Sequence, residues 1–138
     1  MKTFLFLMLV IFSVPLNATE LIIKTETETF VYQTDIAQTP QELQQGLMFK
    51  KELPDNYAMT FLFPSSRVVR MWMKNTFLPL DMIFFDADGV ISHIHQNAEP
   101  FSEETISSFL PAAGVIELLA GTVKEKKIKV GDLIQLKR

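Results

Sequence analysis

The sequence predicts a compact single domain of the mostly-β or α+β class, in which about six to eight short strands form a partly closed, barrel-like sheet with one or two short helices. Two observations predict this fold. Short runs rich in β-branched and aromatic residues recur along the chain, and turn-forming residues separate them. One segment, which begins at Pro40, joins helix-start residues to apolar residues at helical spacing. A chain of 138 residues is long enough for one core, and no second domain is expected.

The N-terminus has the pattern of a secretory signal peptide. Lys2 precedes the apolar run Thr3–Phe12, a proline break follows, and Ala18 offers a small residue for cleavage. The apolar run is shorter than the about 20 residues that span a bilayer. We therefore expect residues 1–18 to be removed after export to the periplasm or beyond the cell, leaving 19–138 as a domain without a membrane anchor. An uncleaved N-terminal anchor is the alternative.

Composition excludes several classes of function. The chain has no cysteine, which excludes disulfides, thiol catalysis and thiolate metal sites. It has 13 Lys and Arg against 16 Asp and Glu, for a formal net charge of −3. Its one basic cluster, residues 124–129, is interrupted by Glu125 and is interpreted as a solvated surface. Nucleic acids and anionic membranes bind clustered Lys and Arg, so neither is an expected partner. No phosphate-binding or dinucleotide fingerprint occurs, and no cofactor is predicted.

The first predicted elements are a β-hairpin and a helix. Leu21–Lys24 and Thr29–Thr34 are rich in β-branched and aromatic residues, which indicates the two strands of a hairpin. In the segment that follows, Thr39 can cap a helix while Glu42 reaches back to it, and a proline occupies the first helical position. We therefore expect a helix from Pro40 to about Met48.

The rest of the chain is predicted to form short strands separated by turns. The expected strands are Ala58–Phe63, Val68–Lys74, Leu80–Phe85, Val90–Gln96, Val115–Leu119 and Leu133–Lys137. Asp86–Gly89 has the composition of a tight turn, and Val130–Asp132 turns the chain into the last strand. Ala120–Lys127 is expected to form a turn or a short helix.

The stretch from Trp72 to Asp81 is the most informative part of the sequence. It places an indole and four polar side chains, those of Lys74, Asn75, Thr76 and Asp81, between apolar runs. A polar group inside a core-forming stretch must be hydrogen-bonded or paired, since an unpaired buried charge is very costly. We expect Lys74 and Asp81 to lie close together across a hairpin, with Asn75 and Thr76 orienting them. The alternative is a structural knot, in which side chains bond to the loop backbone and Asp81 only anchors it.

Glu117 is the second candidate, because it interrupts the apolar run Val115–Leu119. A charge at this position requires a partner such as Lys74, Arg70 or Arg67. A lysine and a carboxylate in a partly apolar pocket are suited to acid–base chemistry. They are equally suited to binding a polar ligand, with the indole as a platform for a flat ring. The alternative is an edge-strand position with the carboxylate in water.

Two histidines lie two residues apart on one predicted strand, so the side chains of His93 and His95 share a face. Such a pair can bind a metal, but no third ligand follows at a suitable spacing. We interpret the pair as part of an exposed strand face, and no metal site is predicted.

Several motifs resemble the domain-of-unknown-function 192 family. In chain order they are Gln45-Gly46-Leu47-Met48-Phe49-Lys50, Leu53-Pro54, Phe61-Leu62-Phe63, Trp72-Met73-Lys74-Asn75-Thr76 with Pro79-Leu80-Asp81-Met82-Ile83-Phe84, Asp88-Gly89, Pro100, Val115-Ile116-Glu117-Leu118 with Gly121, and Gly131-Asp132. The resemblance covers about Thr39 to Leu136, and the Trp-Met-Lys-Asn-Thr string is its most specific part. It implies a small single-domain fold that is often exported, and no established reaction.

Three functions are compatible with these residues. The preferred one is an exported domain that binds a small polar ligand in a pocket lined by Trp72, Lys74, Asn75, Thr76, Asp81 and Glu117. The second is a small hydrolase or lyase that uses Lys74 with Asp81 or Glu117. The third is an envelope accessory protein, in which the segment from Trp72 to Asp81 is purely structural. The sequence identifies no protein partner.

Overall fold

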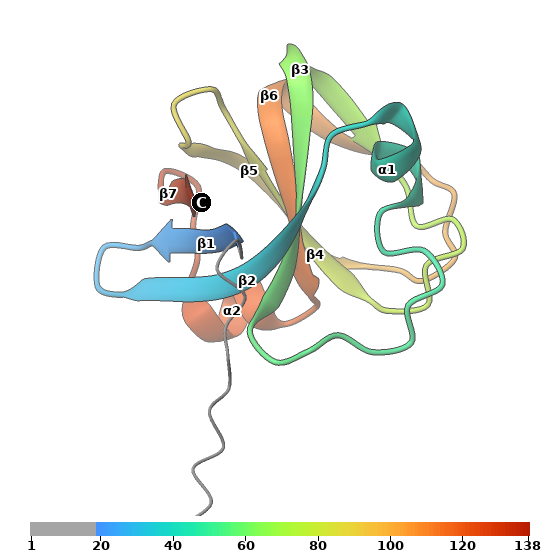
Figure 1. Ribbon diagram of the computed structural model, residues 1–138, viewed down its shortest axis with the longest axis horizontal. Helices are drawn as coiled ribbons and strands as arrows, with labels where there is room; N and C mark the ends of the chain where they lie inside the picture. Colours follow the sequence, from blue (N-terminus) through green and yellow to red (C-terminus); the bar gives the residue numbers. More distant parts are fainter. Residues whose placement is uncertain (1–18) are drawn as a thin grey trace, which may run out of the picture.

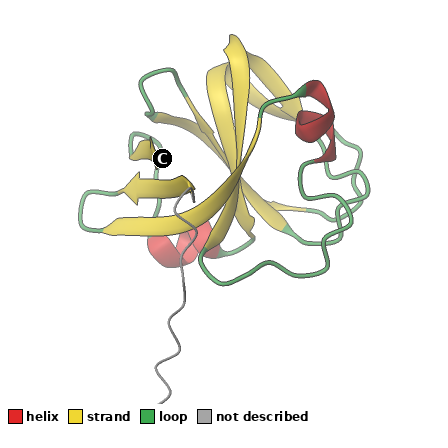
Figure 2. Cartoon of the chain, viewed as in Figure 1, coloured by secondary structure: helices red, strands yellow, loops and turns green. Residues whose placement is uncertain are grey.

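The protein folds as one curled sheet of seven strands with two short helices against it (Figures 1 and 2). The computed structural model describes residues 19–138, and the expected signal peptide, 1–18, lies outside the described residues. The elements are β1 (Thr19–Lys24), β2 (Thr29–Ala37), α1 (Pro40–Gln45), β3 (Tyr57–Met71), β4 (Leu80–Phe85), β5 (Ile91–Ala98), β6 (Ile106–Leu119), α2 (Thr122–Lys126) and β7 (Leu133–Lys137). The predicted fold class is confirmed.

The strands follow the order β5-β4-β6-β3-β2-β1-β7, so the first and last strands of the chain meet near one edge. β1 and β2 form the expected antiparallel hairpin, whereas β2 and β3 run parallel because α1 lies between them. The sheet curls until its edges touch: Val90 bridges Leu133, and the Ile134 N–H donates to the Gly89 carbonyl at 2.7 Å. This contact joins only the ends of β5 and β7, which makes the sheet a half-barrel rather than a closed one.

The two long strands β3 and β6 form the centre of the sheet, where they cross the whole molecule in Figure 1. The sequence predicts two separate strands, Ala58–Phe63 and Val68–Lys74, with a Pro-Ser loop between them. In the structure they are one strand, because β6 pairs with β3 on both sides of a register shift between Leu62 and Arg67. A bulge tolerates proline within a strand. The expected strand at Val115–Leu119 is the second half of β6, which starts at Ile106.

Two apolar cores lie on opposite faces of the sheet, because side chains alternate along β3, β4 and β6. The inner core fills the curl and includes Leu21, Ile23, Tyr32, Ala58, Ile83, Phe85, Ile91, Ile116, Leu118, Val123, Ile128 and Ile134. The outer core lies beneath α1 and the neighbouring loops and includes Ala37, Leu47, Phe61, Val69, Met73, Leu80, Met82, Phe84, Ala98, Ala112 and Val115. Both surfaces of the central strands are therefore buried.

Helix α1 begins as the sequence predicts and ends earlier. The Thr39 hydroxyl accepts the Glu42 N–H at 3.2 Å, and the Glu42 carboxylate accepts the Thr39 N–H at 3.1 Å, which completes a capping box. This bonding lowers the pKa of Glu42. The helix stops at Gln45, because Gly46 takes a φ of +46° that leaves the helical conformation.

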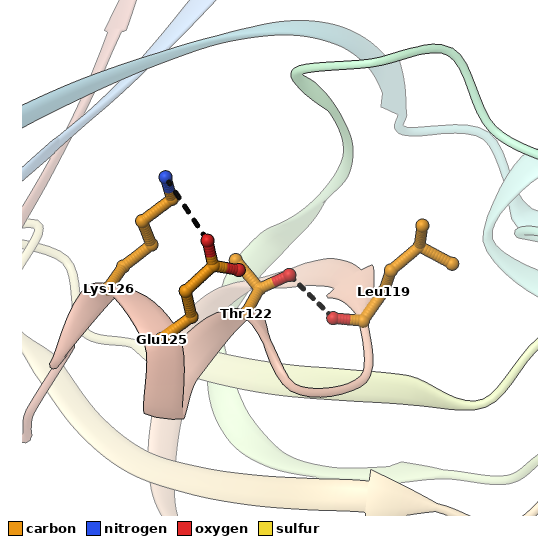
Figure 3. A network of polar contacts seen from close by, with 4 residues as sticks. All are labelled: Leu119, Thr122, Glu125 and Lys126. Atoms are coloured by element: carbon orange, nitrogen blue, oxygen red, sulfur yellow. Dashed lines mark hydrogen bonds and ion pairs between the residues drawn. The ribbon is translucent and has the colours of Figure 1, made fainter.

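Helix α2 closes one end of the curl (Figure 1). Figure 3 shows the Thr122 hydroxyl donating to the Leu119 carbonyl at 2.7 Å, which ties the first turn of α2 to the end of β6. The Lys126–Glu125 ion pair in the same view measures 4.0 Å and is largely exposed, so it adds little stability. Among residues 19–138, no helix has the length and apolar character needed to cross a membrane.

Candidate functional site

Asp81 is fully buried and serves as a backbone anchor. One carboxylate oxygen accepts the Asn97 N–H at 2.9 Å, and the other accepts those of Gly121 and Val123 at 3.1 and 2.9 Å. Gly121 is the N-cap of α2 and has no side chain that could cap the helix, so Asp81 supplies the cap from β4. The three donors lie 16, 40 and 42 residues away in sequence. Asp81 therefore has the structural role that the alternative interpretation assigned to it.

Lys74 and Asp81 do not form the expected ion pair. Among residues 19–138, the only contact that meets the distance for a salt bridge is Lys126–Glu125. The Lys74 ammonium instead lies 5.1 Å from the centre of the Trp72 ring, where it makes a cation–π contact. The predicted pairing is wrong. Three backbone N–H groups already donate hydrogen bonds to the buried Asp81 carboxylate, so it does not need an ammonium as a partner.

The segment between Trp72 and Asp81 is a junction of loop backbones. The Asn75 carbonyl accepts the Phe49 N–H at 2.9 Å, and the Thr76 carbonyl accepts the Phe101 N–H at 3.2 Å. The Thr76 hydroxyl donates to the Lys74 carbonyl at 3.0 Å. Asn75 has a φ of +53°, a left-handed conformation that asparagine tolerates better than most residues. The segment thus links the loop after α1 to the loop after β5.

A pocket of about 370 Å³ opens beside this junction, between α1 and the outer half of β3. Apolar and polar groups share its lining. The apolar side chains include Leu43, Leu47, Met48, Phe61, Phe63, Val69, Met71 and Trp72, and the polar ones include Gln44, Gln45, Thr76, Glu117, Arg67 and Arg70. Of the six residues predicted to bind a ligand, Trp72, Thr76 and Glu117 line this pocket. Lys74, Asn75 and Asp81 do not line it. The Lys74 ammonium lies over the indole, Asn75 is exposed to solvent, and Asp81 faces the inner core.

Asp81 and Glu117 lie on opposite faces of the sheet. Across β4 and β6, Asp81 pairs with Leu118 and Met82 pairs with Glu117. Paired residues share a face and neighbours in a strand alternate, so Asp81 faces the inner core while Glu117 faces the outer core and the pocket. The two carboxylates therefore cannot act on one substrate.

Glu117 lies at the floor of the pocket. The residue is 4% exposed, and no hydrogen bond or ion pair of its carboxyl is found within residues 19–138. Burial in apolar surroundings raises the pKa of Glu117 from 4.5 to about 8, because no neighbouring charge compensates the lost hydration. The edge-strand interpretation of Glu117 is wrong, because β3 and β4 flank β6 on both sides.

The two arginines expected as partners of Glu117 line the same pocket without reaching its carboxylate. Arg67 and Arg70 are both exposed and lie on the outer half of β3. The Arg67 guanidinium lies 5.0 Å from the centre of the Phe63 ring, which holds it at the wall of the pocket. The two arginines are therefore exposed at the pocket, whereas Glu117 is buried within it.

Gly46 is a site residue that sequence reasoning missed. A Cβ at this position would lie 2.9 Å from Phe61 Cζ and 3.8 Å from Glu117 Oε2. Gly46 thus lets the end of α1 approach the pocket floor while it provides the positive φ that ends the helix. The only sequence signal was the glycine in the Gln-Gly-Leu-Met string, which gives no indication of a contact with Phe61 or Glu117.

The two histidines lie apart from the pocket residues. His93 pairs with Phe84 across β4 and β5, and its ring lies 5.7 Å from that of Phe84 and 5.0 Å from that of Phe109. Burial lowers the pKa of His93, with a smaller contribution from His95. Within the described part of the chain, no group of three or more His, Cys, Asp or Glu is arranged to hold a metal ion.

The fold and site define a small half-barrel domain with a pocket on its outer face that has Glu117 at its floor. The chain belongs to the domain-of-unknown-function 192 family (DUF192, "Uncharacterized ACR"), whose sequence profile matches residues 21–136. The predicted family is confirmed, and the family carries no assigned activity.

Two crystal structures are similar to this chain over most of their length. A Sinorhizobium meliloti 1021 protein, described as a candidate transcription regulator, is 42% identical with a TM-score of 0.83, and the match covers 86% of this chain and 93% of that one. A protein of unknown function from Novosphingobium aromaticivorans DSM 12444 is 32% identical with a TM-score of 0.82, and the match covers 84% of this chain and 83% of that one. No curated protein matches the sequence.

Proposed function

We propose that this protein binds a small polar ligand in the pocket between α1 and β3, with the Glu117 carboxyl directed at the ligand. The supporting observation is a carboxyl that is 4% exposed, lies at the floor of a pocket and has no bonding partner within residues 19–138. Burial of a polar group without a partner costs free energy, and such costs are typical of functional sites. A ligand that donates to Glu117 supplies the missing partner.

The walls of the pocket suit a ligand with an apolar body. Phe61, Leu47 and Val69 are almost fully buried and give the floor a fixed shape. Trp72 is 40% exposed at the pocket, so its ring offers a partly open surface for stacking. Small-molecule sites combine apolar side chains with a few well-placed polar groups, and this pocket offers both.

Trp72 provides a direct test, because it is the only tryptophan of the chain and lines the pocket. Sugars, amino acids, amines and nucleotides would be added to the purified protein, and the emission of Trp72 and the melting temperature would be recorded together. A ligand of the pocket is expected to shift the emission and to raise the midpoint in a concentration-dependent manner.

Glu117→Gln keeps the shape of the side chain and removes its charge, and Glu103→Gln makes the same change at an exposed position. The shift should be lost or weakened in the first variant and unchanged in the second. Ligands that shift both variants and the parent protein equally would contradict a role for Glu117, and a complete absence of ligands in the screen would contradict the proposed function.

The other predicted functions have less support. The hydrolase or lyase requires a lysine beside a carboxylate, and Lys74 contacts Trp72 instead. A role in transcription, as in the description of the Sinorhizobium relative, is not carried over, because a net charge of −3 does not favour DNA. An accessory role in the envelope has no specific contact in its favour.

We also propose that the protein is exported with removal of residues 1–18. The pattern of charge and apolar residues at the N-terminus supports this proposal. Mass spectrometry of the protein recovered from cell fractions should find a chain that starts at Thr19 in the periplasm or the medium. A chain that starts at Met1 and remains with the cytoplasm would contradict it.

A further inference from the structure

We propose that the ligand is a zwitterion, with a primary ammonium that binds Glu117 and an anionic group that binds Arg67 and Arg70. This inference rests on the proposed function and specifies the chemical class of the ligand. It follows from an acid at one end of the pocket and two arginines at the other, which the protein does not bring together itself.

The floor of the pocket requires a positive group. Glu117 has Met59 and Met82 as its cross-strand neighbours on β3 and β4, and neither can donate a hydrogen bond. On the other side, a Cβ at Gly46, directly after α1, would lie 3.8 Å from Glu117 Oε2. An ammonium that enters this enclosure gains a charge-assisted hydrogen bond, which is about twice as strong as a neutral one. A neutral donor leaves the carboxylate without its counter-charge.

The titratable neighbours of Glu117 do not supply that charge. Two titratable residues share this face of the sheet. Tyr57 lies two residues before Met59 on β3, and His95 lies on β5, where it pairs with Met82 and forms no ion pair with Glu117. Tyr57 donates its hydroxyl to Asp35 at 2.8 Å, and burial together with Asp35 and Glu117 raises the pKa of Tyr57. Tyr57 is therefore neutral at ordinary pH, and its proton is already shared with another carboxylate.

The mouth of the pocket requires a negative group. Arg67 and Arg70 form no ion pair with an acidic residue among residues 19–138, and both belong to the lining of the pocket. A guanidinium presents several donors in one plane and matches a carboxylate or another planar anion. Two such groups repel a ligand that carries only positive charge, so the ammonium of the ligand needs an anion at its other end.

The separation of the two ends sets the length of the ligand. Arg67 pairs with Ala112 and Met59 pairs with Glu117, so the two positions are divided by the stretch of β6 from 112 to 117. At a rise of about 3.3 Å per residue, this stretch spans roughly 16 Å between backbones, and the two side chains shorten the gap. The inference therefore favours an ω-amino acid, whose charges are several bonds apart, over an α-amino acid.

Binding of four related probes tests the inference: 6-aminohexanoate, hexylamine, hexanoate and hexanamide. Titration calorimetry in two buffers with different heats of protonation would be combined with Trp72 emission. We expect 6-aminohexanoate to bind at least about tenfold more tightly than the other three. We also expect about one proton to be released near pH 7, because a Glu117 that titrates near pH 8 must ionise to pair with the ammonium.

Variants separate the two ends of the ligand. Glu117→Gln should remove the proton release and reduce the affinity for 6-aminohexanoate at least about tenfold. The double change Arg67→Ala and Arg70→Ala should reduce that affinity to the level of hexylamine, whereas Lys124→Ala, an exposed change on α2, should leave it unaltered. The arginine variants lie on the surface and keep the test valid if Glu117→Gln does not fold.

The possible failures differ in meaning. Binding of hexanamide as tight as that of 6-aminohexanoate, without proton release, would overturn the zwitterion and leave the proposed function intact. Equal binding of hexylamine and 6-aminohexanoate would overturn the role of the two arginines. If all four probes fail while another compound shifts Trp72, the zwitterion is again overturned. If no compound of any class shifts Trp72, the proposed function itself fails.

Discussion

Glu117 should make the protein less stable as the pH rises from about 4.5 to about 8. Burial raises its pKa from 4.5 to about 8 in the folded protein, and the unfolded chain keeps the ordinary value. Between these two values the folded state binds one proton that the unfolded state has released. Stability falls with pH wherever the folded state holds more protons, so the stabilisation is complete below pH 4.5 and is lost as the pH passes 8.

The size of this effect follows from the difference between the two pKa values. At roughly 1.4 kcal/mol per pKa unit, the span from 4.5 to about 8 corresponds to about 5 kcal/mol of unfolding free energy. The open pocket admits water to the ionised carboxylate, which reduces the penalty, and we expect about 2 to 5 kcal/mol. Small domains are stable by about 5 to 15 kcal/mol in total, so the loss is large enough to measure easily.

Urea unfolding at about pH 5 and about pH 9 would measure the effect in the parent protein, in Glu117→Gln and in Glu103→Gln. Glutamine imitates the protonated acid at every pH. The Glu117→Gln protein should therefore match the parent at the lower pH and exceed its unfolding free energy by about 2 to 5 kcal/mol at the higher pH. The exposed Glu103→Gln should follow the parent at both. A difference between Glu117→Gln and the parent that stays constant across this range would refute the assignment of a buried, unpaired acid.

Three further predictions test contacts of the fold by the same unfolding measurement. Asp81→Asn should cost about 2 to 4 kcal/mol, because an amide NH₂ would face backbone donors that the carboxylate now satisfies, and a loss below about 0.5 kcal/mol would count against the anchor. Ser108→Ala should cost about 1 to 3 kcal/mol, since its buried hydroxyl accepts the Val69 N–H at 2.9 Å and donates to the Leu110 carbonyl at 2.7 Å. The exposed change Ser66→Ala on β3 is the control. Tyr32→Phe should be neutral or stabilising by up to about 1 kcal/mol, because the buried Tyr32 hydroxyl has no partner among residues 19–138, and clear destabilisation would reveal a bond that the structure lacks.

Local signals in the sequence predicted the elements that depend on local contacts. The hairpin of β1 and β2, the capping box at Thr39 and the strand Leu80–Phe85 all appear where expected. Each is defined by residues within a few positions of one another. The continuity of β3 through its Pro-Ser segment could not be predicted, because this segment has no local preference for a strand. Only the pairing of β3 with β6 on both sides of the segment makes it part of one strand.

The site was predictable in part for the same reason. Glu117 was recognisable as a carboxylate in an apolar strand, and its burial confirms that the pattern was informative. The partners of Asp81 were not recognisable, since the Gly121 and Val123 donors lie 40 and 42 residues away in sequence. A buried aspartate in isolation does not reveal whether it will meet an ammonium or a row of backbone N–H groups.

The alternation along β6 has a consequence for how such a pocket can change during evolution. Val115 and Glu117 face outward, while Ile116 and Leu118 between them belong to the interior of the curl. A lineage can exchange the acid for another group and alter the preference of the pocket without disturbing the neighbouring side chains that hold the fold. Insertions are a different matter, because a shift of one residue would turn every apolar anchor outward and bring the acid inside.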